Sequence, residues 1–138
     1  MKNKIVDSHC HLNFDDFKDD LDDVIKNAKD KDVDYMLSIS IDLEKFEEIY
    51  NLTQKYKNVW CTTGVHPNNV PKKFDIKNIT KLKSQLLKNL LKKKVVGIGE
   101  TGLDYYRGLE NKQNQIDFFE THMPVSYTHL TLPTSYPV

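Results

Sequence analysis

Short apolar runs alternate with longer amphipathic segments along most of this 138-residue chain. The apolar runs predict strands at residues 4–9, 33–41, 59–65 and 94–99. Segments with apolar residues at helical spacing follow them, at 15–32, 43–56, 75–94 and 113–123. Four strands separated by helices predict βαβ units, and therefore an α/β fold with a parallel sheet.

Two parallel architectures fit this alternation: an open doubly wound sheet and half of a TIM (β/α)8 barrel. The glycine-rich phosphate fingerprint of the first does not follow the first predicted strand. Polar residues instead follow the predicted strands, at the rim where barrel active sites form. Because a whole barrel has about 250 residues, residues 1–123 are predicted to be its N-terminal half, with about four βα units.

Two histidines end the first predicted strand, in KIVDSHCHL at residues 4–12. Residues two apart in a strand point to the same face, so His9 and His11 are expected to point together. Neutral imidazoles on one face can hold a divalent metal ion. A hydrogen-bonded pair at a strand end, without a metal, is the alternative interpretation.

A carboxylate follows the fourth predicted strand, in GIGETGLDYYR at residues 97–107. Glu100 shares the predicted rim with the histidines and is a candidate metal ligand that can bridge two ions. A solvated or helix-capping glutamate is the alternative. Asp104 and Arg107 either anchor a substrate or pair with each other in the loop.

A third histidine ends the third predicted strand, in GVHPNN at residues 64–69. Pro67 turns the chain out of the strand directly after it. His66 is interpreted as a contact to a substrate phosphate, as a donor to a metal ligand, or as a plain turn residue.

The overall composition restricts the partners and the compartment. The formal net charge is zero, so no affinity for nucleic acid or membranes follows from charge. We see no apolar stretch of transmembrane length, no secretory signal and no sign of an obligate protein partner. Cys10 and Cys61 are expected to be buried free thiols in a reducing cytoplasm.

The composition changes abruptly near residue 124. Residues 124–138 hold three of the five prolines and no Asp, Glu, Lys or Arg. The nucleotide string GTC TCT TAT ACA CAT CTG ACG CTG CCG ACG translates to VSYTHLTLPT and resembles a transposase adapter used in sequencing libraries. Residues 124–138 are therefore interpreted as a non-native tail, and the native protein is expected to continue beyond Met123. A genuine proline-rich tail is the alternative.

The motifs VDSHCHL, TTGVHP and VGIGETGLDYYR, in this order and spacing, resemble the TatD family of metal-dependent hydrolases. The resemblance covers residues 4–123. It implies a TIM barrel of the amidohydrolase-like superfamily and a site for two divalent ions (Zn, Mn or Mg). His9, His11 and Glu100 match the family's metal ligands, while His66, Asp104 and Arg107 are assigned to substrate binding.

The resemblance also implies a deoxyribonuclease of the 3′-to-5′ exonuclease type, acting on DNA or another ester. The family's remaining metal histidines and its late aspartate, the expected general base, would lie beyond this chain, so no catalytic residue is assigned. Two other interpretations stay open: a related barrel hydrolase that cleaves amides or lactones, and an inert fragment with unpaired strand edges.

Overall fold

The computed structural model describes residues 4–73, 75–106, 108 and 110–130. Its strands are β1 (Ile5–Cys10), β2 (Val33–Ser38), β3 (Val59–Thr63) and β4 (Val95–Ile98). Its α-helices are α1 (Leu21–Asp30), α2 (Phe46–Lys55), α3 (Ile76–Leu90) and α4 (Lys112–Leu130). Short 3-10 helices occupy Asp15–Phe17 and Pro67–Asn69. The predicted alternation of strands and helices is confirmed.

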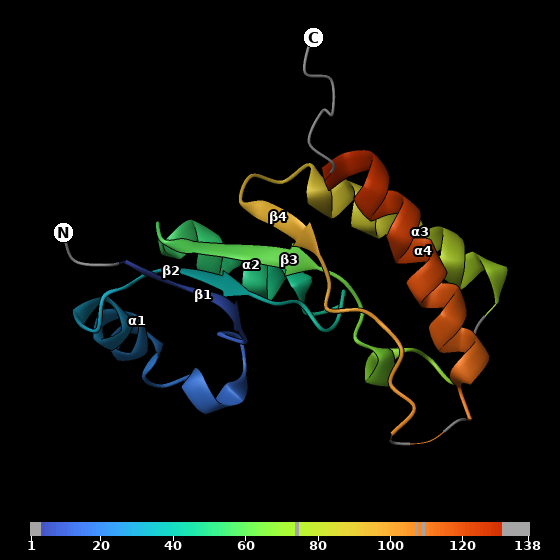
Figure 1. Cartoon of the computed structure of the whole chain (residues 1–138), viewed down its shortest axis with the longest axis horizontal. Helices are drawn as coiled ribbons and strands as arrows, with labels where there is room; N and C mark the ends of the chain where they lie inside the picture. The colour runs from blue at the N-terminus through green and yellow to red at the C-terminus, as the bar shows by residue number, and fades with distance from the viewer. Residues whose placement is uncertain (1–3, 74, 107, 109, 131–138) are drawn as a thin grey trace, which may run out of the picture.

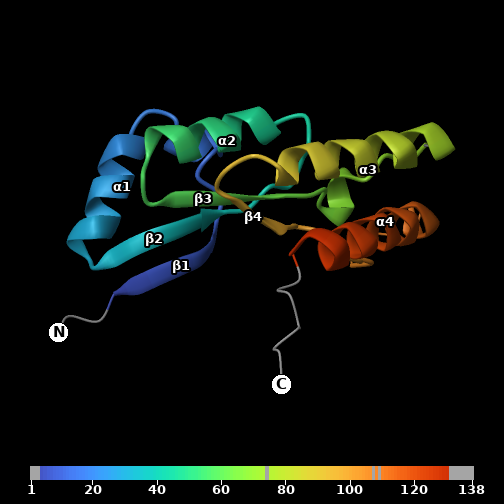
Figure 2. The same cartoon turned by 90° about the horizontal axis from the view of Figure 1, so that it is seen from above.

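The four strands form one parallel sheet in the order β1-β2-β3-β4 (Figure 1). Helices α1, α2 and α3 lie along one face of this sheet, and α4 packs beside α3 (Figure 2). A doubly wound sheet would reverse its strand order and carry helices on both faces. Sequential order with helices on one face is the arrangement of consecutive barrel units, so the half-barrel prediction is confirmed.

The core fills the space between the sheet and its helices. Alternate residues of each strand point into this core, among them Val59 and Cys61, which are fully buried. The helices contribute Phe46 and Ile49 from α2 and Leu86 from α3. Apolar burial of this kind is the main stabilising term of the fold.

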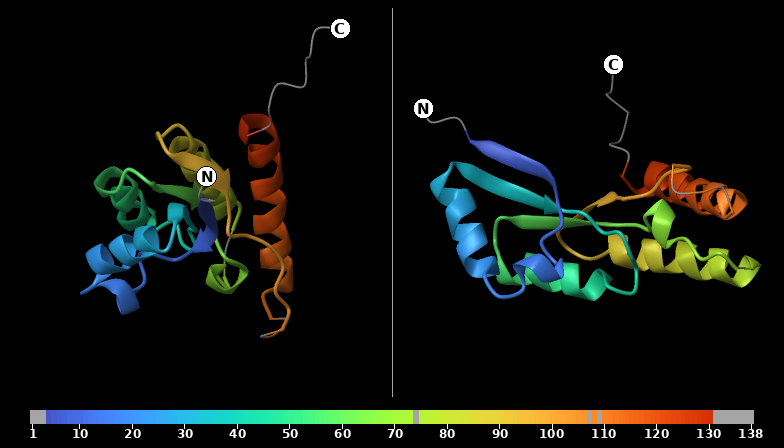
Figure 3. Two further views of the ribbon diagram at one scale, coloured as in Figure 1. Left: turned by 60° about the vertical axis from the view of Figure 1, so that its left-hand side comes forward. Right: turned by 90° about the horizontal axis from the view of Figure 1, so that it is seen from below.

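The remaining alternate residues of each strand point to the opposite face of the sheet. Val6, Tyr35, Trp60 and Val96 line an apolar hollow of about 440 Å³ there. In a complete barrel this face points to the interior, where side chains from all strands fill the centre. In the described part of the chain no helix covers this face, as the view from below in Figure 3 shows.

Among the described helices, none combines the length and the hydropathy needed to cross a membrane.

Two details of the helices differ from the predictions. The predicted helix 15–32 is a 3-10 turn at Asp15–Phe17 followed by α1 from Leu21. Aspartates fill four of the six positions 15–20, and they favour turns and caps over helix interiors. Ile76 fits the helical spacing of apolar residues in the predicted segment 75–94, which favours burial, yet it is 75% exposed because the first turn of α3 extends beyond the sheet (Figure 2).

The start of α3 follows the sequence closely. The Asp75 carboxylate accepts hydrogen bonds from the backbone N–H groups of Lys77 and Asn78. The Asn78 side chain accepts in return from the Asp75 N–H, which completes a capping box. Asp75 is therefore the N-cap of α3.

Helix α4 runs through the compositional boundary at residue 124. Pro124 lies inside the helix, and Val125 is buried beside Val65 and Phe118. The boundary between residues 123 and 124 is therefore not marked by a break in secondary structure. The non-native origin of residues 124–138 stays a prediction, and residues 131–138 lie outside the described residues.

Candidate metal centre

The carboxyl ends of three strands bring four polar side chains together. His9 is the penultimate residue of β1, His11 follows β1, His66 follows β3, and Glu100 follows β4. Ligand atoms of His9, His11 and Glu100 all lie within 4.8 Å of one another. The structure thus assembles the three predicted metal ligands at one rim.

The two carboxylate oxygens of Glu100 face different histidines. Its Oε2 atom lies 3.6 Å from Nε2 of His9 and 3.8 Å from Nε2 of His11. Its Oε1 atom lies 3.7 Å from Nε2 of His66. Glu100 therefore stands between the β1 histidines and the β3 histidine.

His11 presents a free lone pair to the cluster. Its Nδ1 atom lies 3.1 Å from the carbonyl oxygen of Ile39, which can only accept a hydrogen bond. Nδ1 of His11 therefore carries the proton, and Nε2 is left as the acceptor that a metal needs. The ring stacks on Phe14 at a centroid distance of 4.7 Å, which restricts its rotation.

His66 has the opposite arrangement. Its Nδ1 atom accepts a hydrogen bond of 3.1 Å from the backbone N–H of Asn68. In the neutral ring the proton must then reside on Nε2, the atom that faces Glu100. Neutral His66 is thus a hydrogen-bond donor toward the site, whereas neutral His11 is an acceptor.

The donor set fits a divalent metal ion. Bonds of about 2.0–2.2 Å in tetrahedral geometry separate neighbouring ligand atoms by about 3.3–3.6 Å. The separations of 3.6 and 3.8 Å between the histidine Nε2 atoms and Glu100 Oε2 need only a small inward adjustment to reach this range. Imidazole nitrogen and carboxylate oxygen suit Zn, Mn or Mg to different degrees, so the donors alone do not select the ion.

Backbone hydrogen bonds fix the segment that carries Glu100. The Glu100 N–H donates to the carbonyl of Ser40 at 2.6 Å, and the Gly99 N–H donates to the carbonyl of Thr63 at 2.9 Å. The Thr62 hydroxyl donates to the carbonyl of Gly99. Buried hydroxyls that are fully paired in this way hold a loop in one conformation.

A close approach of two glycines places this segment beside β3. A Cβ atom at Gly64 would lie 2.6 Å from the backbone carbon of Gly99. Gly99 itself has φ +141°, a conformation that side chains disfavour. Neither position accepts a larger residue without moving the chain next to Glu100.

The structure places Asp104 in the loop after β4, apart from the metal cluster. Its carboxylate accepts from the backbone N–H of Tyr106 at 3.0 Å. The side-chain amide of Gln115 holds its backbone, accepting from the Asp104 N–H and donating to the Asp104 carbonyl. Arg107, its predicted partner or fellow substrate contact, lies outside the described residues.

Neither cysteine belongs to the cluster. Burial raises the pKa of the Cys10 thiol to about 12, and it has the same effect on Cys61. The thiols therefore stay neutral, and Cys10 donates to the carbonyl of Leu37. Both thiols are free as predicted; Cys61 is buried, whereas Cys10 is only partly buried.

Sequence reasoning missed the hydroxyls that support the rim and one buried histidine, His122. Ser40 and Thr62 sit in or after apolar strands, which gives them no recognisable motif. His122 is 1% exposed and belongs to α4. Its hydrogen bond to Val65 joins residues 57 positions apart, and no local sequence pattern predicts such a contact.

Comparison with known families and proteins identifies the family of the chain. The family model described as TatD related DNase matches residues 6–135. A protein of Buchnera aphidicola subsp. Baizongia pistaciae, named uncharacterized metal-dependent hydrolase, is 38% identical over 127 residues, 90% of this chain and 46% of that protein. YcfH of Escherichia coli K12, also named uncharacterized metal-dependent hydrolase, is 34% identical, covering 88% of this chain and 44% of its own. Human deoxyribonuclease TATDN3 is 36% identical over 107 residues, 73% of this chain and 38% of that protein.

A solved structure supports the fold. The crystal structure of YjjV, a TatD homologue from E. coli K12, superposes with a TM-score of 0.78 at 23% identity, over 91% of this chain and 47% of that one. The chain spans about half the length of the curated relatives it matches. With its four sequential βα units and its rim cluster of His9, His11 and Glu100, the chain belongs to the TatD related DNase family.

Proposed function

We propose that this chain supplies the N-terminal half of a divalent-metal-dependent hydrolase that cleaves phosphodiester bonds in DNA. The observation that carries the proposal is the convergence of His9, His11 and Glu100 at the carboxyl ends of β1 and β4. Membership of the TatD related DNase family and the name of the human relative, deoxyribonuclease, support DNA as the substrate.

We propose that the complete site holds two divalent ions. The opposed directions of Glu100 Oε1 and Oε2 support a bridging carboxylate, with His9 and His11 on the Oε2 side. When bound, such ions supply Lewis acidity and positive charge beside a phosphodiester. His9 and His11 donate imidazole lone pairs, and Glu100 supplies the negative charge that balances the site.

His66 has a separate role in this proposal. Its Nε2–H points into the site and can donate a hydrogen bond to a non-bridging phosphate oxygen. Asp104 and Arg107 are proposed to contact the substrate outside the metal cluster. The general base is expected to be an aspartate outside this chain.

The 138-residue chain alone is proposed to be inactive and to bind metal weakly, because the histidines and the aspartate expected from later strands are not part of it. A cytoplasmic location is proposed for the protein. The two unpaired thiols, Cys10 and Cys61, support a reducing compartment.

The metal half of the proposal is tested on the chain itself. We expect zinc titrated calorimetrically to bind weakly at one site, and binding to be lost in His11→Ala and in Glu100→Ala. Asp104→Ala serves as the matched control, because Asp104 bonds within its own loop. Unchanged zinc binding in both rim variants would refute the assignment.

The substrate half is tested on a protein continued to the length of its relatives. We expect metal-dependent release of mononucleotides from single-stranded DNA, starting from the 3′ end, and loss of that release in Glu100→Ala. Cyclic amides and lactones are assayed in parallel. Hydrolysis of these with no cleavage of DNA would favour the related amide or lactone hydrolases instead.

A further inference from the structure

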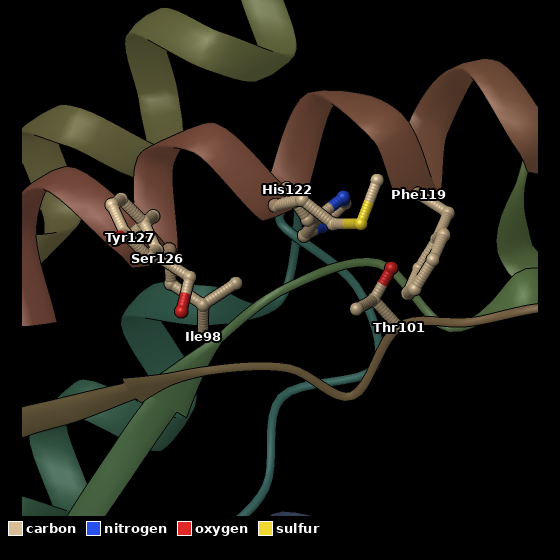
Figure 4. Close-up of a pocket in the computed structure, with 7 residues that line it drawn as sticks. Ile98, Thr101, Phe119, His122, Ser126 and Tyr127 are labelled. Atoms are coloured by element: carbon tan, nitrogen blue, oxygen red, sulfur yellow. The ribbon is translucent and has the colours of Figure 1, made fainter. Parts of the chain in front are cut away.

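A buried histidine outside the metal cluster connects α4 to the rim. His122 is 1% exposed, and its ring lies between α4 and the chain that leaves β3. Its Nε2 atom accepts a hydrogen bond of 3.2 Å from the backbone N–H of Val65. Figure 4 shows His122 above Ile98 and Thr101, at one side of an open apolar cavity of about 340 Å³.

The hydrogen bonds of His122 define one tautomer. Its Nδ1 atom lies 2.6 Å from the carbonyl oxygen of Phe118, so Nδ1 carries the proton and donates. This leaves Nε2 as an acceptor for Val65, and both ring nitrogens are satisfied although the ring is buried. Burial lowers the pKa of His122, which keeps the ring neutral near pH 7.

Val65 directly precedes His66, so the bond from His122 acts on the turn that carries the rim histidine. The next backbone N–H, that of His66, donates to the carbonyl of Ile41 at 2.9 Å. Two successive backbone N–H groups are therefore held by different elements, one by α4 and one by the loop after β2. These two bonds fix the backbone position of His66, and the hydrogen bond from the Asn68 N–H to Nδ1 then fixes the orientation of its ring.

We propose that His122 is a positioning residue, which holds the His66 turn so that the Nε2–H of His66 points at Glu100 and at a bound phosphate. The proposal rests on the proposed function for the role of His66 toward a phosphate. The coupling of His122 to the His66 turn is a property of the chain itself and is measurable without substrate.

Two substitutions separate positioning from general packing. In His122→Asn the shorter side chain can place its amide only near the former Nδ1 position. The hydrogen bond to the Phe118 carbonyl can therefore persist, while that from the Val65 N–H is lost. In His122→Gln the longer side chain can place an acceptor near the former Nε2 position and restore the bond to Val65. Thr121→Val is the control, since the Thr121 hydroxyl donates to the carbonyl of Asp117 within α4.

The measurement is nuclear magnetic resonance of the metal-free 138-residue chain. We expect His122→Asn to speed hydrogen exchange at the Val65 amide by about tenfold, the effect of one lost buried hydrogen bond. The ring nitrogen resonances of His66 should shift as well, and His122→Gln should restore both signals. Unchanged Val65 and His66 signals in His122→Asn would overturn the proposal, as would equal perturbation by both substitutions.

A measurement on the unmodified chain covers the case in which the variants fail to fold. A scalar coupling across the hydrogen bond between the Val65 amide nitrogen and Nε2 of His122 is expected, and its absence overturns the proposal. Zinc binding at His9, His11 and Glu100 reports on the proposed function separately. A chain that shows the coupling but binds no zinc would refute the metal site and leave the role of His122 intact.

Discussion

Nδ1 of His66 accepts the backbone N–H of Asn68, and this bond fixes which nitrogen of His66 faces the metal cluster as a donor. Nδ1 of His11 lies instead against the carbonyl of Ile39. Two histidines at one rim therefore hold their protons on different ring nitrogens. One is prepared to bind a metal and the other to donate a hydrogen bond.

The first prediction concerns these tautomers. In the metal-free chain with both rings neutral, His66 is expected as the Nε2–H form and His11 as the Nδ1–H form. Nitrogen chemical shifts of the two rings distinguish the forms directly. Adding zinc should shift Nε2 of His11 strongly and leave the protonated Nε2 of His66 in place. The same tautomer in both rings would contradict the division of roles.

The location of the site could be predicted from the sequence, but its internal geometry could not. Parallel strands present their carboxyl ends at one rim, so His9, His11, His66 and Glu100 were expected to be neighbours. The β1–β2 register shifts between Asp7 and Cys10, and simple alternation does not fix the direction of a side chain across such an irregularity. The opposed oxygens of Glu100 depend on that register and on the loop after β4.

Long-range contacts explain the other differences. His122 was not predicted because its partner Val65 lies 57 residues away, and a histidine in a helix carries no local signal of such a bond. Ile76 fits the apolar periodicity of α3 but is exposed, because periodicity defines a face and does not say how far the neighbouring sheet extends.

The second prediction tests the contact between β3 and the Glu100 segment. Gly64→Ala places a methyl group 2.6 Å from the Gly99 backbone, so the segment must move. We expect a loss of about 1–3 kcal/mol in the free energy of unfolding, together with weaker zinc binding. Urea unfolding and zinc titration measure the two effects. Gly97→Ala is the milder comparison, because its methyl group would meet side-chain atoms of Thr62, the nearest at 3.0 Å, and no backbone atom within 4 Å; an equal loss in both variants would contradict the prediction.

The third prediction concerns a lysine that caps a helix. Lys94 Nζ donates to the carbonyls of Thr53, Tyr56 and Lys57, at the carboxyl end of α2, where a positive charge is favourable. Lys94→Met keeps the length of the side chain but removes these bonds. A loss of about 1–3 kcal/mol in unfolding free energy is expected from charged hydrogen bonds of this kind. Lys93→Met, at the exposed neighbouring position, should change stability little, and similar values for the two would exclude a capping role.

The fourth prediction is a pH dependence of stability that arises from His122. Burial lowers its pKa in the folded chain, whereas the unfolded histidine titrates near its ordinary value of about 6.5. Below that pH the unfolded chain binds more protons than the folded chain, so the contribution is complete above pH ~6.5 and is lost as the pH falls toward the folded pKa. The cavity lining beside His122 includes no Asp, Glu, Lys or Arg, and Tyr127 is its other titratable member.

Urea unfolding between pH 8 and pH 5 measures this dependence. We expect the wild-type chain to lose stability over this range more steeply than His122→Gln, whose side chain does not titrate. Parallel curves for the two proteins would show that other groups dominate the acid sensitivity of the fold.

The last prediction concerns the open face and edges of the sheet. Val6 and Val96 are 58% and 51% exposed, on β1 and β4, the two strands at the ends of the four-stranded order. Edge strands with exposed apolar residues promote association, and a lysine on such a strand opposes it. We expect the chain to self-associate as its concentration is raised, and Val96→Lys to shift it toward the monomer in sedimentation velocity. Leu91→Lys adds the same charge at the end of α3, at a residue 84% exposed. Because that position is off the sheet, it should leave association unchanged, and an equal effect of both substitutions would show that net charge, not the sheet edge, controls association.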